Sequence, residues 1–261
     1  MNSSVATPVD VKLMNTTAAV LFLAFAGLVV VAAGRWVARL PMFELQSVSV
    51  SGDLDHNNAA TLRVNVASRL RGSFFTIDLV QVRAAFEAVP WVRRAMVRRE
   101  FPNRISVVLQ EHKAVAYWED EESLRLINSY GEVFEANVGE VEQDSLPRLS
   151  GPDGQGAEVL AMYQDLAPQF KAMGLVLQQL ELTGRGSWRG ETEGGASVEL
   201  GRGSVGDVDA RVQRFLKTLT QVTSRYGRQV QAVESADLRH ENGYAIKLQG
   251  VTTLAADEKR K

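Results

Sequence analysis

The chain has 261 residues, of which 45% are hydrophobic and 23% charged, with 29 Lys and Arg against 31 Asp and Glu, three His and no Cys. This composition is typical of a folded protein and excludes a disordered, collagen-like or disulfide-stabilised chain. The lack of cysteine also excludes thiolate catalysis, Cys-ligated zinc and iron–sulfur clusters, and a formal charge of −2 gives no overall reason to bind nucleic acid.

The charge is unevenly distributed along the chain. Residues 35–112 contain 11 basic and 7 acidic residues, whereas residues 113–261 contain 17 basic and 23 acidic residues. The two parts therefore carry formal charges of +4 and −6, and this asymmetry indicates two domains.

The first predicted element is a transmembrane helix at residues 13–34. These 22 residues carry no charge, and at about 1.5 Å per residue they span the hydrocarbon core of about 30 Å. A cleavable signal peptide is the alternative, because small residues precede Gly34, but its apolar core would be only about 7–15 residues long. The flanking charges, Lys12 on one side and Arg35 and Arg39 on the other, do not decide the orientation.

The next segment predicts a strand and then a helix. Residues 43–51 alternate apolar and polar side chains, which is typical of a strand. Asn57 or Asn58 can cap the helix that follows. This helix has an apolar face at helical spacing, formed by Leu62, Val66 and Leu70.

A second helix and two strands complete the first domain. Asp78 resembles the first residue of a capping box, and Pro90 ends the helix. The apolar stripe of this helix consists of Leu79, Val82, Phe86 and Val89. Strands are predicted at residues 92–100 and 105–111, on either side of a turn at Pro102-Asn103. The predicted order is β-α-α-β-β.

From residue 113 onward the pattern predicts short strands with two helices. The helices are expected at residues 157–173, where Pro168 should bend or shorten the helix, and at residues 207–223, the strongest amphipathic pattern in the chain. No strand is predicted in the breaker-rich residues 146–154. Strands are expected at residues 114–118, 124–127, 131–134, 175–182, 188–191, 196–200, 230–238 and 244–248.

The last two strands are predicted to form a hairpin with Asn242-Gly243 as its turn, since both residues tolerate positive φ. Only a polar tail follows, so the final strand is expected to lie at the edge of a sheet. Such an edge can accept a strand from another chain through main-chain hydrogen bonds. The alternative is that the protein's own strands pair with both of its sides.

No residue pattern in the sequence predicts a catalytic, metal or cofactor site. The three His, at positions 56, 112 and 240, have no metal-ligand spacing. Gly201 to Gly206 match the dinucleotide pattern G-x-G-x-x-G, but Asp207 and Asp209 lie where pyrophosphate would sit, which favours a glycine-rich turn. The basic residues Arg93, Arg94, Arg98 and Arg99 can bind an anionic partner or a lipid surface, or form a solvated strand face.

Taken in order, several motifs resemble the FtsQ/DivIB family of bacterial cell division proteins across nearly the whole chain. They are Phe43…Val48-Ser-Val-Ser-Gly52, Phe75-Thr-Ile-Asp78, Pro90-Trp-Val92, Phe101-Pro102, Glu111-His112, Ala116-Tyr-Trp118, Leu149-Ser-Gly-Pro152, Ser187-Trp188, Leu200-Gly-Arg202 and Asp237-Leu-Arg239…Asn242-Gly243. The resemblance implies an α+β protein with a single N-terminal transmembrane helix. It implies a cytoplasmic segment at 1–12, the membrane helix at 13–34, a POTRA domain at 43–112, a β-rich FtsQ-type domain with two helices at 113–250 and a polar tail at 251–261.

The resemblance also implies a function without catalysis or a cofactor. A protein of this kind is a scaffold of the divisome that binds FtsB and FtsL, contacts other divisome proteins and inner membrane lipid, and helps to control septal peptidoglycan synthesis. Its N-terminus is cytoplasmic and its domains are periplasmic, at the division septum. The positions matching the family's partner-binding region are Arg239, His240, Asn242, Gly243, Tyr244, Ile246, Leu248 and, before Ser187-Trp188, Arg185.

Three positions depart from the family pattern. His240 stands where Tyr is common, Leu248 where Trp can occur, and Ala114 where Pro is usual. Tyr244 and Ile246 are therefore expected to supply the apolar anchors. Two other functions stay open on the sequence: an envelope assembly or secretion accessory that uses its POTRA domain as a chaperone, and a nucleotide-dependent enzyme using Gly201 to Gly206.

Overall fold

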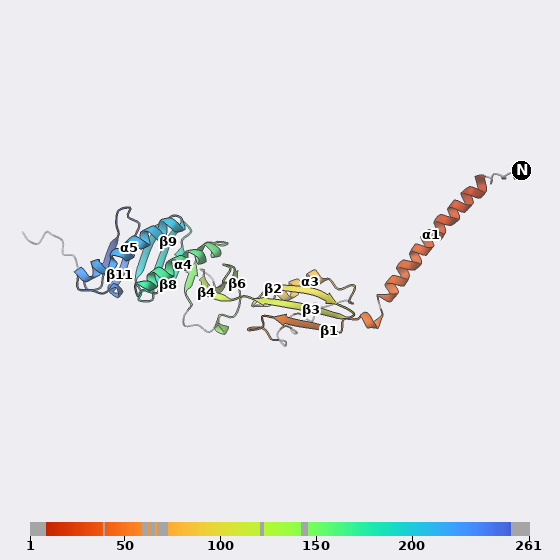
Figure 1. Ribbon diagram of the computed structural model, residues 1–261, viewed down its shortest axis with the longest axis horizontal. Helices are drawn as coiled ribbons and strands as arrows, with labels where there is room; N and C mark the ends of the chain where they lie inside the picture. The colour runs from red at the N-terminus through yellow and green to blue at the C-terminus, as the bar shows by residue number, and fades with distance from the viewer. Residues whose placement is uncertain are drawn as a thin grey trace, which may run out of the picture. The chain divides into compact units, whose positions relative to one another are not determined.

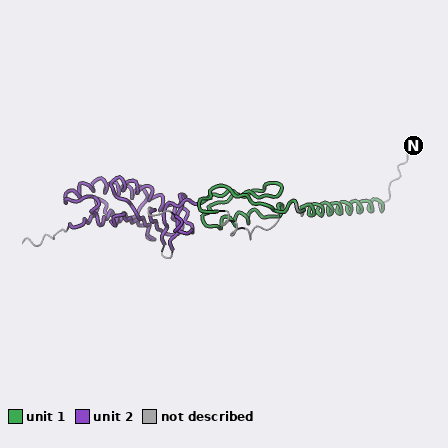
Figure 2. Tube along the Cα trace, turned by 90° about the horizontal axis from the view of Figure 1, so that it is seen from below, with its two compact units in different colours: residues 1–111 green, residues 112–261 purple. Residues whose placement is uncertain are grey.

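The protein divides into two compact units, Met1–Glu111 and His112–Lys261 (Figures 1 and 2). The computed structural model describes residues 9–38, 40–58, 62, 66, 73–120, 123–141 and 146–251. Each unit has its own hydrophobic core, so each is described by itself.

The first unit begins with α1 (Val9–Val37), a helix that fits a single transmembrane segment. Within its span Asp10–Val37, the most apolar 18 residues have a mean hydropathy of 2.4, and none of them is buried by other described residues. A helix that exposes so many apolar side chains needs an apolar solvent, and 28 residues at about 1.5 Å each exceed the thickness of a bilayer core.

A three-stranded sheet with the order β1-β3-β2 follows α1. β1 (Ser47–Gly52) pairs parallel with β3 (Arg104–Glu111), and β2 (Val92–Glu100) pairs antiparallel with β3. The central strand is therefore the most buried, with Ile105 and Val107 at 0% exposure. β1 starts four residues later than predicted, because the chain first makes a 3-10 turn, η1 (Pro41–Phe43).

Helix α3 (Leu79–Glu87) packs Val82, Ala85 and Phe86 onto this sheet and begins at the predicted cap, Asp78. The Asp78 carboxylate accepts hydrogen bonds from the backbone N–H groups of Val80 at 2.8 Å and Gln81 at 3.4 Å. The predicted helix before α3 falls largely outside the described residues, Leu70 included. Leu62 and Val66 are helical and buried, at 4% and 2% exposure.

Removing the cap of α3 should destabilise the first unit. We expect Asp78→Ala to lower its free energy of unfolding by about 1 kcal/mol, because the two N–H groups lose their acceptor. Asp78→Asn keeps an acceptor oxygen and should retain most of the stability. Hydrogen exchange of the β2 and β3 amides measures both variants, and equal losses in the two would contradict the capping role.

A buried carboxylate fixes the end of β3. Glu111, 5% exposed, accepts hydrogen bonds from the backbone N–H groups of His56 at 2.9 Å and Asn57 at 3.0 Å, and from the Asn57 side chain at 2.9 Å. The His56 ring, whose Nδ1 lies 3.2 Å from the same carboxylate, stacks on Trp91 with ring centroids 3.8 Å apart. These bonds tie the loop after β1 to the end of β3.

The second unit is a nine-stranded mixed sheet with two helices on one face (Figure 1). The strand order is β12-β11-β10-β9-β8-β7-β4-β5-β6. The strands are β4 (Ala114–Glu119), β5 (Leu124–Asn128), β6 (Val133–Phe134), β7 (Arg148–Ser150), β8 (Leu177–Leu182), β9 (Ser187–Thr192), β10 (Ser197–Arg202), β11 (Val233–Asp237) and β12 (Ala245–Leu248). The α+β prediction is thereby confirmed.

Helices α4 (Gly156–Ala172) and α5 (Val205–Arg225) cover the core of this unit. The apolar stripe predicted for α5 is buried: Val208, Val212 and Leu219 are each 0% exposed. Pro168 does not end α4, which continues to Ala172. Leu166 and Phe170, on either side of the proline, are both 0% exposed, so packing holds the helix through it.

One central strand was missed by the sequence prediction. β7 lies in the breaker-rich residues 146–154 and pairs parallel with both β4 and β8. Its middle residue, Leu149, is 0% exposed. The Pro, Gly and Ser residues around β7 predict a loop. The strand forms because partners more than 25 residues away in the sequence stabilise it.

Candidate partner-binding edge

β12 is the last strand of the nine-stranded sheet, as predicted. It pairs antiparallel with β11, and β11 pairs parallel with β10. The strand order ends at β12, so no strand among the described residues lies on its outer side. The alternative, in which β12 is enclosed by the protein's own strands, is wrong for the described part of the chain.

The hydrogen bonds around β11 show which backbone groups of β12 face outward. Leu238 N–H bonds to Glu199 of β10 at 2.8 Å, and Gln249 N–H bonds to Ala232 at 2.8 Å. Backbone groups alternate between the two sides of a strand. Gln249, Lys247 and Ala245 therefore bond toward β11, and the N–H and C=O groups of Ile246 and the N–H of Leu248 face the open edge.

Side chains on the core side of β12 anchor it to α5. The Tyr244 hydroxyl lies 2.8 Å from the Thr218 hydroxyl, and the Tyr244 ring contacts Phe215 edge to face at 5.0 Å. Leu248 is 5% exposed within the core, and Ile246 packs partly against it. These side chains hold the strand in place, while its backbone supplies the open edge.

The loop before β12 differs from the predicted Asn-Gly turn. Neither Asn242 nor Gly243 has positive φ, and the strands are joined by the seven residues 238–244. The loop is held from α5 instead, since the Arg214 guanidinium donates to the Glu241 carbonyl at 2.7 Å. His240 and Asn242 are exposed on this loop, beside the start of the edge.

Arg239 is paired within the chain. Its guanidinium donates to both carboxylate oxygens of Asp237, at 2.9 and 2.6 Å, and its backbone N–H donates to the same carboxylate at 3.0 Å. This pairing lowers the pKa of Asp237 from 3.8 to about 2. Asp237 belongs to the motif Asp237-Leu-Arg239 but was not among the predicted site residues, because spacing alone does not show that its carboxylate pairs with Arg239. A partner carboxylate would have to share Arg239 with it.

The low pKa of Asp237 gives a pH dependence with a definite sign. A depressed carboxyl pKa means that the pair stabilises the protein fully above about pH 3.8 and is lost as the pH falls through about 2. We expect Arg239→Gln to return the pKa of Asp237 toward 3.8. Carboxyl NMR titration measures it, Arg185→Gln is the control that should change nothing, and a low pKa in Arg239→Gln would contradict the pairing.

Arg185 lies at the same end of the sheet as this loop but on a different hairpin. Arg185 is exposed in the turn between β8 and β9. Ser187, two residues later, begins β9 and pairs with Arg202 at the end of β10. Three strand spacings separate β9 from β12, or about 14 Å. The structure therefore places Arg185 on the same side of the unit without bringing it into the edge itself.

The glycine motif at residues 201–206 forms the turn into α5. Ser204 caps the helix, and the Asp207 carboxylate accepts from the Ser204 backbone N–H at 2.9 Å and from its hydroxyl at 2.7 Å. The hydroxyl bond is the main cause that lowers the pKa of Asp207. A side chain on Gly203, whose φ is +131°, would come within 2.8 Å of Asp207. The helix terminus that would bind pyrophosphate is thus filled by a carboxylate.

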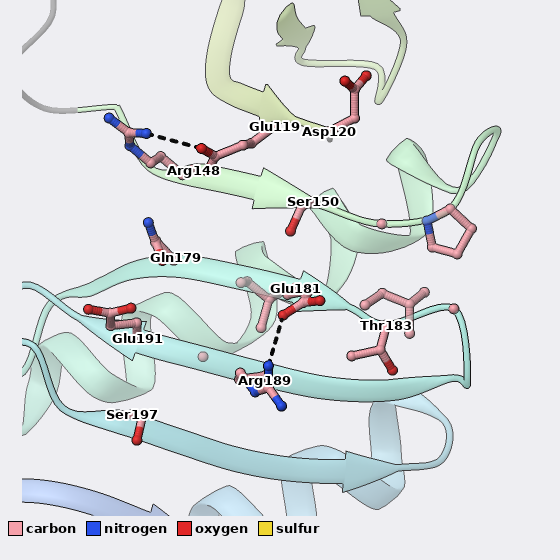
Figure 3. A pocket seen from close by; sticks show the side chains of 16 residues that line it. Glu119, Asp120, Arg148, Ser150, Gln179, Glu181, Thr183, Arg189, Glu191 and Ser197 are labelled. Carbon is pink, nitrogen blue, oxygen red and sulfur yellow. Dashed lines mark hydrogen bonds and ion pairs between the residues drawn. The ribbon is translucent and has the colours of Figure 1, made fainter. Parts of the chain in front are cut away.

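A hollow of about 590 Å³ lies on the sheet face opposite the helices (Figure 3). Four of its charged side chains form ion pairs with one another, Arg148 with Glu119 at 3.4 Å and Arg189 with Glu181 at 3.5 Å. Arg189 also bonds Glu199 at 2.7 Å. Over the described ranges, no three His, Cys, Asp or Glu side chains come together as a metal site.

Comparison with known proteins matches both units. The family profile described as "POTRA domain, FtsQ-type" matches residues 43–112, and the profile "Cell division protein FtsQ/DivIB, C-terminal" matches residues 116–239. Proteins named "Cell division protein FtsQ" from Burkholderia pseudomallei and Thiomonas arsenitoxydans are 39% and 37% identical to this chain. The alignments cover 97% and 94% of this chain, and 98% and 89% of the two relatives. The chain therefore belongs to the FtsQ/DivIB family of bacterial cell division proteins.

Proposed function

We propose that this protein is a non-enzymatic scaffold of the divisome that binds FtsB, and with it FtsL, by accepting a strand at the open edge of β12. The observation that carries the proposal is the position of β12 at the end of the sheet order, with the Ile246 and Leu248 amides facing outward. Family membership supports a role in division. Strand addition would extend the sheet to a tenth strand, with main-chain bonds supplying affinity.

Side chains beside the edge would supply selectivity. Ala245 and Lys247 are exposed on the face of β12 that points away from the core, and Lys247 forms an ion pair with Glu234 of β11. Asn242 and Gly243 lie next to the start of the edge, where a side chain on Gly243 would meet no atom within 4 Å. Arg239 and Arg185 would contribute charge around this end of the sheet, and His240 an exposed polar ring, rather than a buried anchor.

Cysteine cross-linking tests strand addition directly, because the native chain contains no cysteine. In cell envelopes, Lys247→Cys should form disulfides with Cys placed at alternate positions of one FtsB segment, since side chains of a strand alternate between faces. Ser197→Cys, exposed on β10 away from the edge, is the matched control. Cross-links without a two-residue period, or equally strong at Ser197→Cys, would refute strand addition.

The proposal also includes the place of the protein in the cell. α1 would cross the inner membrane with the N-terminus in the cytoplasm, and the part of the first unit that follows α1, together with the second unit, would lie in the periplasm at the septum. A fluorescent fusion of the full chain should form a ring at midcell. Uniform envelope fluorescence would favour the accessory function in envelope assembly or secretion over the divisome scaffold.

A further inference from the structure

The first unit carries an exposed apolar tip at the end where the chain leaves α1. We define this apolar tip as Met42, Phe75 and Phe101, whose exposures are 56%, 49% and 74%. They come from three segments, namely η1, the turn at 73–77 and the connection between β2 and β3. These residues lie outside the open edge of β12 and have no part in the proposed strand addition.

Backbone hydrogen bonds hold the three segments together. Phe74 N–H donates to the Phe43 carbonyl at 2.9 Å, which joins the turn to η1. Gln46 N–H donates to the Asn103 carbonyl at 3.0 Å, which joins the connection between β2 and β3 to the same stretch. The tip is thus one assembled surface rather than three separate loop ends.

Two buried rings support the exposed ones. Phe43 and Phe74 are 9% and 7% exposed. The Phe43 ring lies 4.8 Å from Phe75, and the Phe74 ring lies 6.1 Å from Phe101, both in tilted or edge-on contact. The Arg99 guanidinium also donates to the Phe74 carbonyl at 2.8 Å, fixing the turn from below. Phe75 and Phe101 are therefore held outward although apolar side chains of this size favour burial.

The short connection between α1 and the apolar tip indicates that the tip contacts the membrane surface. α1 ends at Val37, and Met42 follows five residues later, so the tip can lie no more than about 18 Å from the end of the helix. Trp36, 67% exposed in the last turn of α1, is an aromatic residue typical of the membrane interface. A surface so close to the end of a membrane helix lies at the lipid headgroups.

The chemistry of the tip fits the same location. Phe and Met supply apolar side chains that enter the boundary between headgroups and acyl chains. Arg35, in the last turn of α1, and Arg104, exposed next to the Phe101 connection, supply positive charge that favours anionic headgroups. Together they make an apolar surface with basic residues close to it in the sequence.

We propose that the apolar tip inserts into the interfacial region of the leaflet from which α1 emerges. The first unit then has two attachments to the membrane, one covalent through α1 and one through Met42, Phe75 and Phe101. The second attachment does not depend on β12 or on any protein partner. It limits the rotation of this unit about its short tether.

Fluorescence quenching in full-length protein tests the proposal. Phe101→Cys, labelled with an environment-sensitive dye, is reconstituted in vesicles of phosphatidylethanolamine and phosphatidylglycerol that contain doxyl-labelled lipid. Met96→Cys is the matched control, because Met96 is 63% exposed in β2. It lies five residues before Phe101, which places it about 16 Å from the tip along the strand. We expect quenching of the Phe101 label to be at least about twofold stronger than that of the Met96 label.

Phe75→Cys gives a second reading from another segment of the tip and should be quenched like Phe101→Cys. Equal quenching at the tip and at Met96 would overturn the proposal. So would a signal that depends on the ratio of protein to lipid rather than on the doxyl lipid, because it would show that a second copy covers the tip. A tip label that shifts only when another membrane protein is added would overturn it as well.

Discussion

Replacing Ile246 by Pro is expected to weaken capture of FtsB by about 100-fold, whereas replacing it by Ala should cost far less. Both changes remove the partly buried Ile246 side chain, but only Pro removes the N–H that faces the open edge. A lost donor and the acceptor left unpaired in the partner together amount to about 3 kcal/mol, which equals about 100-fold in Kd. Binding of full-length protein to an FtsB peptide in detergent measures the difference.

Ile246→Pro and Ile246→Ala can be compared because proline is tolerated at a strand edge, where its missing N–H breaks no internal hydrogen bond. Hydrogen exchange of the β11 amides shows whether the second unit remains folded in each variant. If Ile246→Pro and Ile246→Ala weaken binding equally, the side chain and not the backbone makes the contact. Strand addition at β12 would then be wrong.

Replacing Glu111 by Ala is expected to destabilise the first unit by about 3–5 kcal/mol. The carboxylate is 5% exposed and is the acceptor for the His56 and Asn57 backbone N–H groups and the Asn57 side chain. Alanine would leave the two buried donors of Asn57 and the part-buried His56 N–H without this acceptor. Hydrogen exchange of the β2 and β3 amides in the full chain reports the free energy of opening of this unit alone.

Two further variants separate the role of Glu111 from a general loss of charge. Glu111→Gln keeps one acceptor oxygen and should lose an intermediate amount of stability. Glu100→Ala removes an acid from an ion pair with Arg98, whose side chain is 72% exposed, and should cost less than about 1 kcal/mol. A loss in Glu111→Ala no larger than in Glu100→Ala would show that the buried carboxylate is not an anchor.

The amount of the fold that was predictable depended on how local the signal was. α5 was found because Val208, Val212 and Leu219 repeat at helical spacing. β7 was missed because its three residues are stabilised by β4 and β8, which are distant in the sequence. The Pro, Gly and Ser residues near β7 predicted a loop. The pairing of β7 with distant strands leaves no periodic pattern in the sequence from which a strand could be predicted.

The candidate site shows the same division. The edge position of β12 was predicted because a polar tail follows it, and the strand order of the described residues confirms it. The pairing of Arg239 with Asp237 depends on side-chain geometry that spacing alone does not determine. The hairpin of β11 and β12 was predicted correctly, but its loop is longer than an Asn-Gly turn, and the contact between Arg214 and the Glu241 carbonyl that holds this loop joins residues 27 positions apart.

The two ends of the nine-stranded sheet are unequal, and this limits what the second unit can assemble into. β6, at the far end, has only Val133 and Phe134 in the sheet, whereas β12 has four residues. A head-to-tail polymer would need ladders of comparable length at both margins. If β12 accepts a strand as proposed, growth at that margin would end after a single addition, and the expected product is a complex of fixed stoichiometry.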